Sequence, residues 1–200
     1  MSRLRQTIAP LGQTSAVVWV GFAIAGGFVA LAVVIVVGSA LADPGGWTGF
    51  GVAAATLVPV LLLSSWSLLR PGQAAAALAV VALAPVGFGV WTLLDYDASW
   101  SWENDNGPLG LILTLAVAGP AVVLGLVRPR PAGVLLLVVS ILPGVLAVVG
   151  AGFAGSSLFE PFSVALVTAP IVVGGLLYLL APAGSPAQEL AGESREHSNG

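Results

Sequence analysis

Four acidic side chains lie in one hydrophilic stretch near the middle of the chain. They alternate with aromatic and small residues, so an extended segment would place acids on one face and rings on the other. Clustered carboxylates offer hard oxygen ligands to a divalent cation. The candidate ligands on this outer face are Asp95, Asp97, Glu103 and Asp105. The spacing is not that of an EF-hand, and the alternative is an interfacial strip with rings at headgroup depth and carboxylates in water.

A layer of prolines is the second pattern that could carry chemistry. Each proline falls near the middle of a hydrophobic segment, where it frees the carbonyl four residues earlier to meet a donor, a water or a ligand. This favours a central cavity, as in transporters whose site is formed by interrupted helices. The alternative is ordinary packing of proline-containing membrane helices. The candidate cavity-lining residues are Pro59, Pro85, Pro120, Pro143 and Pro170, with the hydroxyls of Thr56, Ser140 and Thr168.

Groups for covalent or acid–base catalysis are missing from the hydrophobic segments. None of these segments contains Asp, Glu, Lys, Arg, His, Asn or Gln, and the chain has no cysteine and a single histidine, His197, close to its end. Nucleophile–base pairs and phosphate-binding loops are absent as well. We therefore expect no enzymatic activity, no cofactor and no catalytic metal. Arginines occur singly or in pairs, so we expect no nucleic-acid partner.

Hydrophobic segments of membrane length must position these candidate residues. Apolar residues make up 58% of the chain and charged residues only 8%, which is too few to cover a water-soluble fold of this size. Continuous apolar runs of about 20 residues predict helices, because barrel strands would alternate apolar with polar residues. The sequence predicts an all-α bundle of six transmembrane helices over residues 16–42, 50–69, 74–94, 109–127, 132–152 and 162–181.

The distribution of charge predicts how the chain crosses the bilayer. With six spans, every arginine falls on one side and the acids of the connecting segments fall on the other. By the positive-inside rule both termini are then cytoplasmic. We expect a multi-pass protein of the cell membrane, from a GC-rich bacterium by its composition. Its soluble parts would be a cytoplasmic N-terminal segment (1–15), an outer acidic and Trp-rich loop (95–108) and a disordered cytoplasmic tail (182–200).

Other sequence features bear on assembly and on the N-terminus. Aromatic residues at span ends, Tyr96 and Tyr178 among them, fit an aromatic belt. Small residues four apart, such as Gly21 and Ala25, would let helices approach closely, although a chain this rich in Ala and Gly also produces such pairs by chance. The first span ends in a small-residue pattern that resembles a signal-peptide cleavage site, but its apolar region is too long for one, and we expect it to be retained.

Two functional hypotheses follow from these observations. The first is a non-enzymatic structural or accessory component of the membrane. The second is a small permease or channel for an apolar or weakly polar solute, using the proline-kinked helices. The expected partners are membrane lipids, with a membrane-protein partner or a second copy of the chain in addition.

Overall fold

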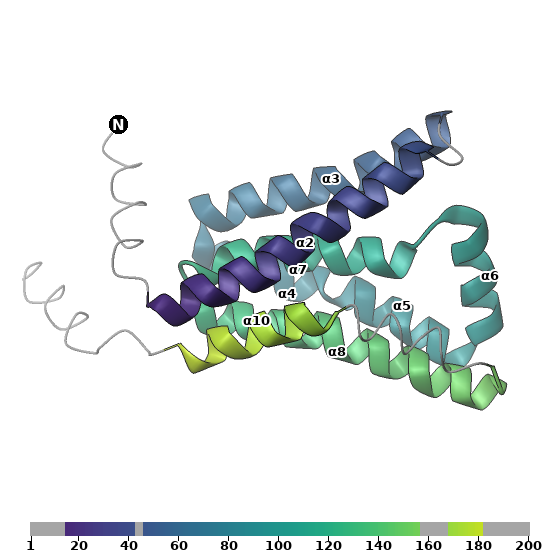
Figure 1. Ribbon diagram of the computed structural model, residues 1–200. Coiled ribbons are helices and arrows are strands. Elements are labelled where there is room, and N and C mark those ends of the chain that lie inside the picture. Colours follow the sequence, from purple (N-terminus) through teal and green to yellow (C-terminus); the bar gives the residue numbers. More distant parts are fainter. Residues whose placement is uncertain (1–14, 43–45, 157–167, 182–200) are drawn as a thin grey trace, which may run out of the picture.

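A computed structural model describes residues 15–42, 46–156 and 168–181, of which 92% are helical and none lie in strands. The expectation of an all-helical fold is confirmed for this part of the chain. Eight helices follow one another in the described residues (Figure 1). They are α2 (Ala16–Ala42), α3 (Gly46–Leu69), α4 (Pro71–Val81), α5 (Leu83–Leu94), α6 (Tyr96–Asn106), α7 (Leu109–Gly125), α8 (Pro129–Ala154) and α10 (Ala169–Leu180).

Four of these helices, counting α4 and α5 as one, are long and apolar enough to cross a membrane. A fifth span arises if α6 and α7 are taken together, although they meet at an angle of 80°. The structure therefore supports a multi-pass membrane protein with four or five long apolar helices. The expected sixth span corresponds to α10, which has 12 described residues; residues 162–167 of that span lie outside the described part.

The first expected span has the same bounds as α2, whereas the second and third expected spans differ from the observed helices. The second begins earlier than expected, at Gly46, and the third is interrupted at Ala82, between α4 and α5. The interruption lies three residues before Pro85. Proline has no N–H to bond the carbonyl four residues back, so Pro85 leaves the carbonyl of Val81 without its helical donor. Ala82 itself keeps right-handed helical dihedrals, and its amide still donates to the carbonyl of Leu78 at 2.8 Å.

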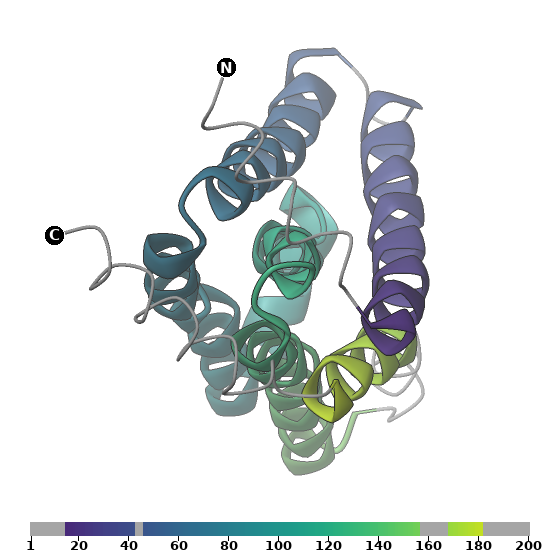
Figure 2. The ribbon, with the colours of Figure 1, turned by 90° about the vertical axis from the view of Figure 1, so that its left-hand side faces the viewer.

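Helix α7 forms the centre of the bundle, and Figure 2 shows the other long helices around it. Every residue from Thr114 to Val122 is buried, as expected for a helix that is apolar on all sides. The surrounding helices turn large apolar side chains outward; Val34 is 67% exposed and Leu62 66%. An apolar centre with an equally apolar outer surface is typical of a protein dissolved in lipid.

Glycines allow α10 to pack closely on two neighbours. Gly174 lies against Ala25 of α2, and Gly175 lies against Gly133 of α8. The pair Gly21 and Ala25 therefore belongs to a real helix contact, because Gly21 lies against the backbone of Gly174. Small residues at such positions let helix axes approach.

Tyr178 is a buried link between the last helix and the central one. Its hydroxyl donates to the carbonyl of Val122 at 2.8 Å, and its ring lies against Gly125. The carbonyl is available because the final turn of α7 tightens, with the amide of Leu126 bonded to Val123 instead. The expected place of Tyr178 in an aromatic belt is wrong, and so is that of Tyr96, which is 6% exposed.

Candidate functional site

The acidic stretch folds into helix α6, which corrects the expectation of an extended segment. The carboxylate of Asp95 caps the helix by accepting the amide of Ala98 at 3.1 Å. Tyr96 and Ser99 are buried and Trp100 and Glu103 half-buried, so the inward face follows the spacing of an α-helix. The alternation of acids and rings read from the sequence therefore has no counterpart in the structure.

This helix separates the four carboxylates expected to form a cation site. Successive helical residues turn by about 100°, so Asp95 and Asp97 point in different directions. Asp97 and Asp105 are exposed, whereas Glu103 turns inward. Within the described ranges, no three acidic, histidine or cysteine residues are grouped so that they could hold a metal ion.

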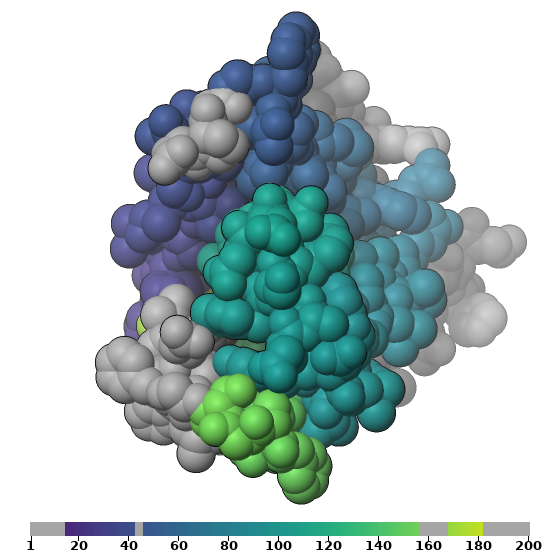
Figure 3. Space-filling view, turned by 90° about the vertical axis from the view of Figure 1, so that its right-hand side faces the viewer, coloured from purple at the N-terminus to yellow at the C-terminus, as the bar shows by residue number. Residues whose placement is uncertain are grey.

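A sharp turn lays α6 across one end of the bundle. Gly107 ends α6 with a φ of 101°, a backbone conformation that a residue with a Cβ rarely adopts. Pro108 follows and α7 begins at Leu109, at an angle of 80° to α6. Figure 3 looks onto this end, where α6 lies beside the end of α8. As a result, the inward face of α6 closes over the space between the helices beneath it.

Glu103 connects α6 to the beginning of α7. One of its carboxylate oxygens, Oε1, accepts the amide hydrogen of Gly110 at 2.7 Å, one of the amides that a helix N-terminus leaves without an intrahelical partner. Gly110 has no side chain to obstruct this contact; a Cβ there would lie 2.9 Å from the ring of Phe88. Burial raises the pKa of Glu103, and the hydrogen bond from Gly110 offsets part of that rise.

Beneath α6 lies a cavity of about 540 Å³, within the range of small-molecule sites. Its wall is mainly apolar, with several hydroxyls and one carboxylate placed among aromatic rings. Helices α5, α6, α7 and α8 contribute to it, and Thr168 reaches it from the start of α10. The lining residues include Phe88, Thr92, Tyr96, Ser99, Trp100, Glu103, Gly110, Thr114, Ser140, Pro143 and Thr168.

The structure brings only part of the expected proline layer to this cavity. Ser140, Pro143 and Thr168 line it. Pro59, Pro85, Pro120 and Pro170 line neither this cavity nor the smaller one described below. Thr56 does not either; its hydroxyl donates to the carbonyl of Val52 in its own helix, at 2.8 Å.

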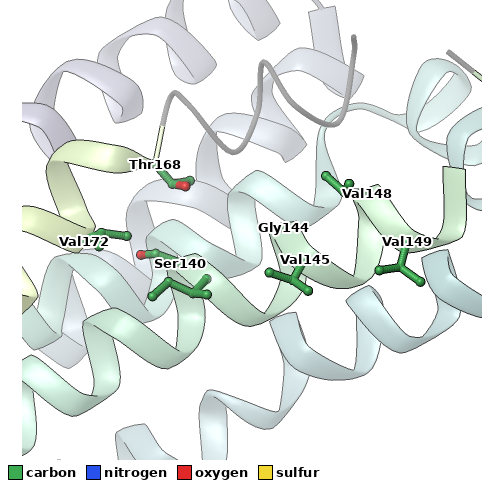
Figure 4. A pocket seen from close by; sticks show the side chains of 8 residues that line it. Ser140, Gly144, Val145, Val148, Val149, Thr168 and Val172 are labelled. Carbon is green, nitrogen blue, oxygen red and sulfur yellow. The ribbon is translucent and has the colours of Figure 1, made fainter. Parts of the chain in front are cut away.

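A second cavity of about 260 Å³ lies between α8 and the start of α10 (Figure 4). Ser140, Gly144 and Thr168 line both cavities, so the two share part of one wall of α8. The hydroxyl oxygen of Ser140 is buried and has no hydrogen-bond partner among the described residues. A buried polar atom without a partner is uncommon, and here it marks the junction of the two cavities.

Several lining residues were not foreseen from the sequence. Phe88, Trp100 and Gly110 come from different helices, and no local pattern joins them. One signal was present: Tyr96, Ser99, Trp100 and Glu103 have helical spacing after a capping aspartate. The alternation of acids and rings was given more weight than this helical spacing.

Comparison with protein families, with characterised proteins and with solved structures finds no match to this chain. Function is therefore inferred from the site itself.

Proposed function

We propose that this chain is a non-enzymatic, multi-pass membrane protein that binds a small amphiphilic molecule in the cavity beneath α6. The observation that carries the proposal is the cavity itself, about 540 Å³ in volume. A purely structural bundle gains nothing from such a space, because an unfilled cavity costs packing energy. Of the two functional hypotheses, the cavity favours the permease-like one.

The lining suits a molecule with an apolar body and a polar end. Most of the wall is apolar, while Glu103, Ser99 and Thr114 are among the few residues that contribute side-chain oxygen atoms to it. Pockets with a few polar groups in an apolar wall orient ligands of this kind.

We further propose six spans, with both termini in the cytoplasm of a cell-membrane protein. The guanidinium of Arg128 lies beside Gly72, so the two arginine-containing turns meet at one end of the bundle. Helix α6, with its acids, lies at the opposite end (Figure 1). The positive-inside rule then assigns the arginine end to the cytoplasm, and the cavity faces outward.

Filling the cavity tests the binding proposal. Ala147 is half-buried and lines the cavity, so Ala147→Phe would occupy the space, whereas Ala55→Phe makes the same change at an exposed position of α3. The full-length protein in lipid nanodiscs is equilibrated with 1-adamantanol, a compact neutral amphiphile, and empty nanodiscs serve as the blank. We expect saturable binding by the wild type and by Ala55→Phe, reduced about tenfold or more in Ala147→Phe. Equal binding by all three proteins would overturn the proposal.

A further inference from the structure

We propose that the ligand class of the cavity beneath α6 is an organic cation, an ammonium ion carried on a compact apolar body. The inference rests on the proposed function and names the chemistry of the molecule that the cavity holds.

The charge balance of the cavity is the first reason. Among the described residues that line the cavity, Glu103 is the only one with a carboxylate, and none is an arginine, lysine or histidine. Helices α5 and α7 contain no charged residue, and the one arginine within α8, Arg130, lies in its first turn, at the far end of the bundle from α6. On α6 itself, Asp97 and Asp105 face outward. A partly buried carboxylate without a cationic partner is unfavourable, and a bound cation would supply that partner.

The free side of the carboxylate is the second reason. Oε1 accepts the amide of Gly110, while Oε2 makes no hydrogen bond to the described residues. The hydrogen bond to Gly110 fixes the carboxyl group at the edge of the cavity. The remaining oxygen is thus held in place as an acceptor, in the manner of a preorganised binding group.

Three hydroxyls of the lining favour a donor ligand as well. Ser99, Thr92 and Thr114 each donate their hydrogen to a carbonyl of their own helix, at 2.9, 3.0 and 2.8 Å. Their oxygen atoms therefore have lone pairs left and no hydrogen to give. An ammonium ion brings donors and needs only acceptors, so it matches these three oxygen atoms better than a neutral acceptor or an anion does, while the unpartnered hydroxyl of Ser140 keeps a hydrogen of its own to donate.

Aromatic rings complete the site. Tyr96 and Trp100 stack with ring centroids 6.2 Å apart and planes within 6°, and both lie on the same face of α6 as Glu103. Phe88 contributes a third ring from α5. The faces of such rings attract cations, so rings and carboxylate favour the same sign of charge.

Protons would compete with such a ligand. Because burial raises the pKa of Glu103, protonation removes the negative charge at a higher pH than for an exposed glutamate. Binding of the cation should therefore weaken as the pH is lowered, and binding of a neutral molecule should not.

Three probes with one adamantane body and different charge test the inference on the full-length protein in nanodiscs. They are 1-adamantylammonium, 1-adamantanol and 1-adamantanecarboxylate, and affinities are measured by equilibrium dialysis against empty nanodiscs of the same lipid. We expect the wild type to bind the cation at least about tenfold more tightly than the alcohol, and the anion weakest. In Glu103→Gln the preference should disappear while the alcohol still binds, since a glutamine oxygen can still accept the amide of Gly110.

The matched control is Asp97→Asn, which removes an exposed carboxylate from the same helix and should keep the preference. If the wild type binds the cation and the alcohol equally, the inference is overturned and the proposed function stands. An equal loss of preference in Asp97→Asn and Glu103→Gln would indicate a surface-charge effect and would also overturn it. If the wild type binds none of the three probes, both the inference and the proposed function are overturned.

Discussion

At the scale of single residues, Glu103 has two roles that meet in one carboxyl group. It accepts an amide hydrogen of the first turn of α7, that of Gly110, and it is the one carboxylate that the described part of the chain contributes to the cavity wall. The sequence indicated that this residue mattered but assigned it to an outer acid face with Asp95, because a period of two was read where the backbone has a period of 3.6. Ser140 and Thr168 were foreseen as candidates, because hydroxyls near prolines are the few polar groups in otherwise apolar segments.

The raised pKa of Glu103 predicts a pH dependence of stability. The folded protein holds this proton up to a higher pH than the unfolded chain does, for which the reference pKa is 4.5. Its contribution to stability is therefore fully present below that value and is lost as the pH rises through the folded pKa. Relative to Glu103→Gln, which cannot titrate, the wild type should be most stable near pH 4 and lose stability toward neutral pH.

Thermal unfolding of both proteins in the same nanodiscs between pH 4 and pH 8 measures this difference. The other acids are common to both proteins and cancel. A difference in unfolding temperature that stays constant across the range would contradict the prediction.

At the scale of elements, hydropathy predicts helix length well and helix ends less well. The bounds of α2 were predicted from its apolar run, because the helix begins and ends with that run. The break at Ala82 was not, since a proline shows where a backbone bond is lost but not which residue becomes the turn. Helix α6 was missed because the alternation of acids and rings was taken as a sign of an extended segment. Asp, Asn and Ser weaken its helix propensity, but capping by Asp95 and packing on α5 outweigh that weakness.

The contact between α2 and α10 provides a matched pair of glycine substitutions. A Cβ at Gly174 would overlap Ala25, whereas one at Gly27 of α2 would meet nothing within 4 Å. We expect Gly174→Ala to destabilise the protein by about 1–3 kcal/mol through overpacking. Gly27→Ala should be neutral, or stabilise it by about 0.5–1 kcal/mol through helix propensity.

Reversible unfolding of both variants in mixed detergent micelles, monitored by circular dichroism, gives the two changes in free energy. Equal effects of the two substitutions would show that α10 does not rest on α2 as described.

At the scale of the whole molecule, the bundle is built around α7 and has charges of opposite sign at its two ends. The sequence predicted the lipid environment and the segregation of charge. It could not identify α7 as the central helix, because its hydropathy resembles that of its neighbours. The small residues of α7, such as Gly119 and Gly125, are the feature that sets it apart from its neighbours. In the structure these two glycines lie against side chains from distant parts of the chain.

The proposed orientation predicts which connections are cytoplasmic. A reporter enzyme that is active only in the cytoplasm should be active when fused after residue 72 or 130, in the arginine-containing turns. Fused after residue 105, at the end of α6, it should be inactive. The opposite pattern would show that the bundle has the reverse orientation in the membrane, with the cavity facing the cytoplasm.

The bond between Tyr178 and Val122 has a consequence for how the protein is made. The bundle's innermost segment emerges from the ribosome well before the residue that completes its hydrogen bonding. During that interval the carbonyl of Val122 lacks the hydroxyl of Tyr178 as its donor, and the ring of Tyr178 is not yet packed against Gly125. We therefore expect final assembly to wait for the last helix, with the nascent chain held in the insertion machinery or by surrounding lipid until synthesis has passed that tyrosine.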